Sequence, residues 1–97
     1  MTIEIWRIDL TGKDKPEKMG GYGSVSLFSV LFFMEDMATK ECERRADVDH
    51  VSRVINKVDT RVISRFTLIG KEPHSPSLVE YIYRIVEDDE DDDDTTG

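Results

Sequence analysis

Two groups of ionisable side chains in this 97-residue chain have the types and spacing that binding chemistry requires. The first is a run of eight consecutive acids: Glu87, Asp88, Asp89, Glu90, Asp91, Asp92, Asp93 and Asp94. A polyanion of this kind attracts basic protein surfaces, and its charge density is like that of a nucleic-acid backbone. We therefore predict that this run binds a basic surface on a protein partner, or mimics nucleic acid there.

The second group is basic. Arg53, Lys57 and Arg61 are spaced four residues apart, with Arg65 nearby in sequence. On a helix this spacing forms one face that can contact phosphates. The alternative prediction is therefore a nucleic-acid-binding module that uses the basic face within residues 44–65 and is inhibited by its own acidic tail. The balance of 13 bases against 21 acids, a net charge of −8, weighs against it, because nucleic-acid-binding domains are usually basic.

Catalytic residue patterns are not indicated. Nucleophilic catalysis needs a cysteine or serine beside a base, and on one helix Cys42 and His50 would be about 12 Å apart. Residues 20–25 read Gly-Gly-Tyr-Gly-Ser-Val, which matches half of a kinase phosphate loop, but Lys18 replaces its first glycine. The chain also lacks the kinase catalytic-loop and metal-binding motifs. We predict no enzymatic activity and no cofactor.

Metal ligands are equally sparse. One cysteine and two distant histidines cannot form a structural zinc site. Asp47 and Asp49 are residue types that commonly begin a helix, and the acidic run lacks the fixed ligand spacing of a calcium loop. We predict no metal site.

The acidity is concentrated at one end of the chain. Eight of the 21 acids lie at 87–94, so the remaining 13 acids balance the 13 bases and residues 1–86 are formally neutral. Residues 87–97 offer no apolar side chain to bury, and adjacent like charges repel each other. The sequence predicts a compact domain over residues 1–86 and a disordered acidic tail over residues 87–97.

Targeting features point to the interior of a cell. Cys42 is the only cysteine, so no intramolecular disulfide can form. Residues 1–7 lack the basic start of a secretory signal. The most apolar run, residues 22–34, is shorter than the roughly 20 residues that span a bilayer. We expect a cytoplasmic or nuclear protein, in its own cell or a host's, that is not secreted and does not enter membranes.

Strands are predicted at residues 2–10, 61–69 and 78–86, which are rich in β-branched and aromatic side chains. Residues 11–23, with four glycines and one proline, are predicted to form a loop. Residues 24–34 fit either a helix with Ser24 as its N-cap or a strand that is apolar on both faces.

Residues 35–46 are predicted to be helical, because acids precede bases by four residues in the pairs Asp36/Lys40 and Glu41/Arg45. A second helical stretch is expected after Asp47, where apolar residues recur at intervals of three, four and three: Val48, Val51, Ile55 and Val58. The expected fold is α+β, with a three- to four-stranded, mainly antiparallel sheet packed against one or two helices.

These features favour a non-enzymatic interaction protein, such as a small regulator or inhibitor of a type that viruses also encode. It would bind a protein partner, and nucleic acid is a less favoured ligand. Residues 2–10 and 78–86 would be edge strands through which two copies could pair as a homodimer.

Overall fold

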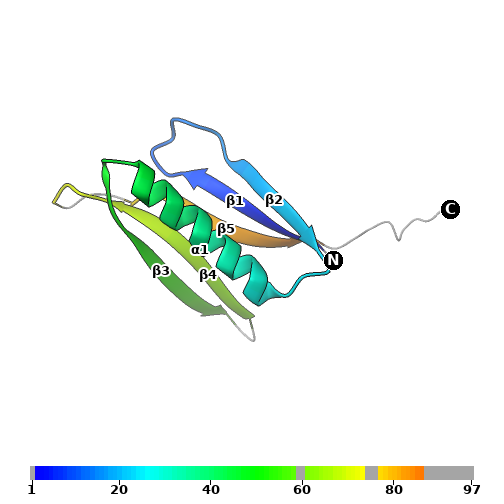
Figure 1. Cartoon of the computed structure of the whole chain (residues 1–97). Helices are drawn as coiled ribbons and strands as arrows, with labels where there is room; N and C mark the ends of the chain where they lie inside the picture. The colour runs from blue at the N-terminus through cyan, green and yellow to red at the C-terminus, as the bar shows by residue number, and fades with distance from the viewer. Residues whose placement is uncertain (1, 59–60, 74–76, 87–97) are drawn as a thin grey trace.

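A computed structural model describes residues 2–58, 61–73 and 77–86, of which residues 55–58 and 61–63 are described by their backbone alone (Figure 1). The elements in chain order are β1 (Thr2–Asp9), β2 (Glu17–Gly23), α1 (Leu27–Arg44), β3 (Val48–Val58), β4 (Arg61–Gly70) and β5 (Ser77–Val86). The strands form one antiparallel sheet in the order β2-β1-β5-β4-β3, and α1 lies across one face of it. The α+β class is confirmed, but the sheet has five strands instead of the expected three or four.

The three predicted strands are present, and all of them lie in the interior of the sheet. β1 pairs with β2 on one side and with β5 on the other, from Thr2 opposite Val86 to Asp9 opposite Val79. β5 in turn pairs with β4. The prediction that residues 2–10 and 78–86 are edge strands is therefore wrong, because β2 and β3 occupy the two edges.

β2 replaces part of the predicted loop. Gly20 suits a strand here because it lies beside large side chains: it is opposite Ile5 and close to Tyr22, which is opposite Ile3. A β-carbon at residue 20 would lie 2.7 Å from the Tyr22 hydroxyl oxygen. The Tyr22 ring instead lies along the strand, with its centroid 5.1 Å from that of Phe33 on α1.

β3 replaces the predicted second helix. A bulge shifts its register against β4 between Val48 and His50. Because the bulge adds one residue to the strand, Val48 and Val51 both pack toward the core although they are three positions apart. An interval of three is typical of a helix, so the bulge accounts for the first of the three intervals on which the incorrect helix prediction rested.

Residues 27–34 of the ambiguous segment 24–34 belong to α1 and are helical. The helix N-cap is Ser26, whose side chain accepts a hydrogen bond from the Ser29 backbone amide at 3.2 Å, so the prediction of Ser24 as the cap is wrong. Ser24 instead has a φ of 59° where the chain turns from β2 toward the helix. Both predicted helix ion pairs are confirmed: Lys40 Nζ lies 3.0 Å from Asp36, and an Arg45 guanidinium nitrogen lies 2.9 Å from Glu41.

The core lies between α1 and the sheet. Val30, Met34 and Ala38 are fully buried on the inner face of the helix. They belong to one apolar cluster with sheet residues such as Ile5 and Leu68. Hydrophobic burial of this single layer is the main contribution that holds helix and sheet together.

No helix or strand among the described residues covers the opposite face of the sheet. This face carries its own cross-strand ion pairs: Lys18 lies 3.3 Å from Glu4, and Arg65 lies 3.2 Å from Glu80. An antiparallel sheet commonly leaves one such face to solvent.

Within the described residues, no helix combines the length and the apolar character needed to cross a bilayer. The predicted acidic tail at residues 87–97 lies outside them.

Candidate functional site

Two phenylalanines project from the outer side of α1. Phe28 is 85% exposed and Phe32 is 67% exposed, whereas Val30 and Met34 on the same helix are fully buried. Phe28 and Phe32 are four residues apart, so they lie on the same side of the helix, one turn apart. Two large aromatic side chains exposed side by side are unusual for a protein surface and mark a candidate interaction site.

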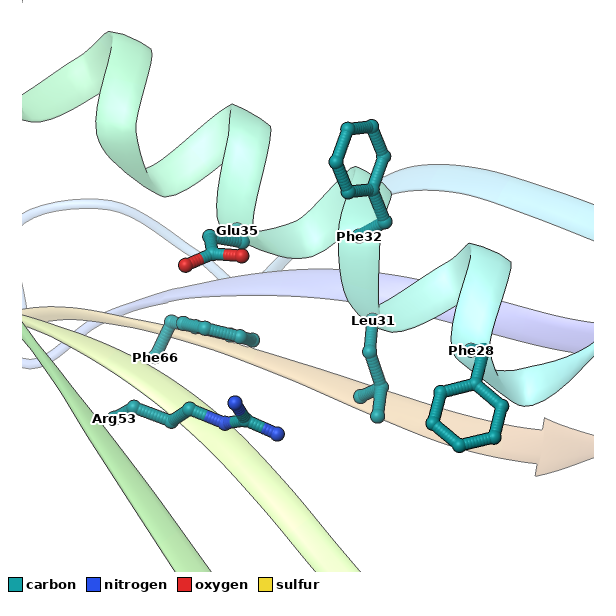
Figure 2. A pocket seen from close by; sticks show the side chains of 6 residues that line it. All are labelled: Phe28, Leu31, Phe32, Glu35, Arg53 and Phe66. Atoms are coloured by element: carbon teal, nitrogen blue, oxygen red, sulfur yellow. The ribbon is translucent and has the colours of Figure 1, made fainter.

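The phenylalanines border an open groove of about 240 Å³ between α1 and the sheet (Figure 2). Its lining residues come from α1, β3 and β4: Phe28, Leu31, Phe32, Glu35, Arg53 and Phe66. Phe66 is only 2% exposed. In Figure 2 it lies between Glu35 and Arg53, while Phe28 and Leu31 lie toward the beginning of the helix. The groove therefore has an apolar end and a charged end.

The charged end carries one base and one acid. The Arg53 guanidinium lies over the Phe66 ring, with its central carbon 5.8 Å from the ring centroid, which is within range of a cation–π contact. Among the residues that the structure describes, neither Arg53 nor Glu35 forms an ion pair. Both side chains are exposed.

A second polar cluster lies at the other end of α1, under the helix. Glu41 is 3% exposed. Its carboxylate accepts two hydrogen bonds from the Arg7 guanidinium, at 2.9 and 2.6 Å, one from Arg45 at 2.9 Å and one from the Tyr81 hydroxyl at 2.6 Å. Arg45 also binds Asp47 just beyond the helix end, at 2.9 and 2.7 Å.

These contacts shift the ionisation of the cluster. The hydrogen bonds from Arg7 are the main cause that lowers the pKa of Glu41 from 4.5 to about 2, against the opposing effect of burial. Burial, together with the adjacent carboxylate, raises the pKa of Tyr81. Glu41 is therefore ionised, and Tyr81 neutral, at any physiological pH.

The Glu41 cluster serves to position the helix. Both carboxylate oxygens are already occupied by donors from β1, β5 and the end of α1 itself, and the side chain is closed to solvent. The contacts fix the C-terminal part of α1 over the middle of the sheet. With that end fixed, the beginning of the helix holds Phe28 and Phe32 over the groove.

Two members of the predicted basic group have described side chains, Arg53 and Arg65, and these lie on opposite faces of the sheet. Arg53 pairs with Phe66 in the register of β3 and β4, and its side chain lies on the helix side of the sheet. Arg65, the residue next to Phe66, pairs with Glu80 on the opposite face. Lys57 lies in β3 and Arg61 begins β4, but only their backbone is described.

The other predicted site residues also have defined places where they are described. The acidic run at 87–94 lies outside the described residues. Cys42 is partly buried against the core, and the His50 ring lies 2.8 Å from Asp49 on the exposed part of β3. In the described part of the chain, no three His, Cys, Asp or Glu side chains gather as metal ligands.

Sequence reasoning did not single out Phe28 and Phe32. Their exposure depends on where the helix begins, because a shift in its start changes which residues face the sheet. The available signal was the spacing itself: if Val30, Met34 and Ala38 form the inner stripe, Phe28 and Phe32 must lie nearly opposite.

Compared with known proteins, the chain matches no family model, no curated protein and no solved structure.

Proposed function

We propose that this chain is a small, non-enzymatic interaction protein that binds another protein chain through the groove beside α1. The observation that carries the proposal is the exposure of Phe28 and Phe32, at 85% and 67%, beside a groove with two available charges. Aromatic side chains that become buried on binding contribute strongly to protein interfaces.

The geometry supports docking of a protein surface better than binding of a small molecule. The groove is open, and its lining includes two phenylalanines that are largely exposed. A small-molecule site usually encloses most of its ligand. An apolar surface of another protein can cover both rings and still leave the charged end at the rim.

The acidic run at 87–94 is the second part of the proposal. It follows β5, whose last residue, Val86, lies beside Thr2 at one end of the sheet. We expect these acids to attract a basic surface on a regulated or inhibited partner, where they would occupy a site for phosphates. Such attraction raises the association rate and weakens steeply with salt.

The test is affinity capture from native extract with four versions of the full chain. They are the unaltered protein, the double variant Phe28→Ser/Phe32→Ser, a control Val54→Ser and a deletion of residues 87–97. Val54 is a suitable control because it is an exposed apolar residue outside the groove.

We expect at least one protein to be captured by the unaltered and Val54→Ser chains and lost with the double variant, and its purified form to bind directly. Deleting residues 87–97 should weaken binding of a basic partner and reduce its salt dependence. If no protein, including further copies of this chain, requires Phe28 and Phe32, the groove is not a protein-binding site. Binding of the truncated chain to duplex DNA or RNA at low salt would instead favour the nucleic-acid-binding alternative.

A further inference from the structure

The charges in the groove indicate which protein binds there. Glu35 on α1 and Arg53 on β3 line the same groove, and neither has an ion-pair partner among the described residues. We infer that the groove binds a second copy of this chain, in a two-fold dimer in which Glu35 of each copy pairs with Arg53 of the other. This inference rests on the proposed function, since it names the protein that occupies the proposed site.

A two-fold interface requires a surface that is complementary to itself, because every contact occurs twice with the roles exchanged. The groove surface meets this requirement. It carries one acid and one base, so both find an opposite charge across the axis, and its apolar part can pack against its own copy. A partner whose surface carried charges of only one sign would leave either Glu35 or Arg53 without an opposite charge.

The aromatic residues supply a substantial part of the area that a dimer needs. A buried aromatic side chain removes roughly 150–250 Å² of surface from water. With Phe28 85% and Phe32 67% exposed, four rings across the axis would bury on the order of 600 Å². Stable interfaces begin near about 1,200 Å² in total. Leu31, Glu35, Arg53 and the surrounding backbone must supply the rest, which predicts a dimer of moderate affinity.

Two other surfaces fit a second copy less well. β1 and β5, the strands expected to pair between copies, are already paired on both sides within the sheet. On the open face of the sheet, Glu4 and Glu80 already pair with Lys18 and Arg65. The groove thus combines exposed aromatic area with charges that have no partner in the described chain.

Sedimentation equilibrium of the purified full chain, up to hundreds of micromolar, tests the inference. We expect a monomer–dimer equilibrium for the unaltered protein. Glu35→Lys and Arg53→Glu should each weaken the dimer at least tenfold, because each brings two like-charge pairs together across the axis. Phe28→Ser/Phe32→Ser should abolish the dimer.

The decisive experiment mixes the two charge variants, Glu35→Lys and Arg53→Glu. In the mixed dimer, position 35 of the Glu35→Lys chain faces position 53 of the Arg53→Glu chain, so a base and an acid meet with their roles exchanged. The unaltered Glu35 and Arg53 form the original pair at the other contact. We therefore expect an equimolar mixture to recover a heterodimer with nearly the original affinity. A salt bridge within one chain cannot produce this recovery, because each variant carries only one of the two substitutions.

Two control substitutions change charge outside the groove. Asp36→Lys makes the same charge change as Glu35→Lys at the next helix position, and Arg84→Glu changes an exposed base on β5. Both should leave the dimer intact, and circular dichroism should show all variants folded.

A monomeric unaltered protein, or a dimer that none of the groove variants weakens, would overturn the inference. Failure of the mixture to recover the dimer would overturn the Glu35–Arg53 pairing on which it rests. If the unaltered chain is monomeric but captures a different protein only when Phe28 and Phe32 are present, the inference fails and the proposed function stands.

Discussion

Glu41 is a charged side chain on the inner face of a helix, where burial of an unpaired charge would be strongly unfavourable. Its two oxygens accept hydrogen bonds from Arg7, Arg45 and Tyr81. The Glu41→Gln variant preserves the volume but leaves two guanidinium groups facing a neutral amide. We expect it to lower the free energy of unfolding by about 3 kcal/mol, as for a buried ion pair that loses one partner. Urea denaturation at neutral pH measures this difference.

The matched control is Asp36→Asn, which removes a carboxylate from an ion pair on the exposed side of the same helix. The Asp36 and Lys40 side chains are 52% and 67% exposed, so their pairing is well screened by solvent. The control should leave the unfolding midpoint almost unchanged. Equal losses in the two variants would show that the buried cluster has no special role in stability.

The same cluster predicts how stability depends on pH. The pKa of Glu41 is lowered from 4.5 to about 2, chiefly by the hydrogen bonds from Arg7. Its stabilising contribution is therefore complete above the unfolded-state pKa and is lost as the pH falls from about 4.5 toward 2. The difference in unfolding free energy between the unaltered protein and Glu41→Gln should be constant near neutral pH and shrink across this acidic range. A difference that grows as the pH falls would contradict the assigned ionisation.

At the level of residues, sequence reasoning identified only the local half of this cluster. The Glu41/Arg45 pair is four residues apart and follows from helix geometry. Arg7 and Tyr81 are 34 and 40 residues away from Glu41 and meet it only through the order of strands in the sheet. No spacing rule along the chain predicts such contacts.

At the scale of elements, the start of α1 decides which residues reach the groove. Ser26 caps the helix through its side-chain oxygen, so Ser26→Ala should lower the free energy of unfolding by about 1 kcal/mol. Ser24→Ala should have little effect on the free energy of unfolding, because Ser24 lies before the cap. Serine and alanine also both carry a β-carbon, so the substitution does not change the strain of the positive φ at residue 24. Thermal denaturation of the two variants distinguishes these positions. A larger loss for Ser24→Ala would place the helix start two residues earlier.

Some strands of the sheet can be predicted from their sequence and others cannot. β1, β4 and β5 are rich in β-branched and aromatic residues and were predicted nearly to their ends. β2 was missed because its glycines are typical of loops, and only Tyr22 and Met19 pack toward the core. β3 was missed because a bulge imitates helical spacing. In both cases pairing with a neighbouring strand outweighs the local preference of the sequence.

At the scale of the whole molecule, the strand order predicts a gradient of local stability. β1, β5 and β4 have neighbours on both sides, whereas β2 and β3 have a neighbour on one side only. Amide hydrogen exchange followed by mass spectrometry should therefore be slowest in β1, β5 and the part of β4 that pairs with β5, and faster in β2 and β3. Uniform protection across all five strands would contradict this order.

The place of β5 in the middle of the sheet, between β1 and β4, also has a consequence for how the chain reaches its fold. β1 and β2 are neighbours in sequence, as are β3 and β4, so each pair can form locally. Within the sheet the two pairs are joined only by β5, the last of these strands to be synthesised, which also brings Tyr81 to Glu41. A nascent chain that ends before residue 77 therefore holds two half-sheets without their connecting strand. Acquisition of the native fold should wait until β5 has left the ribosome, and a separate peptide of residues 77–86 should be able to complete the truncated chain.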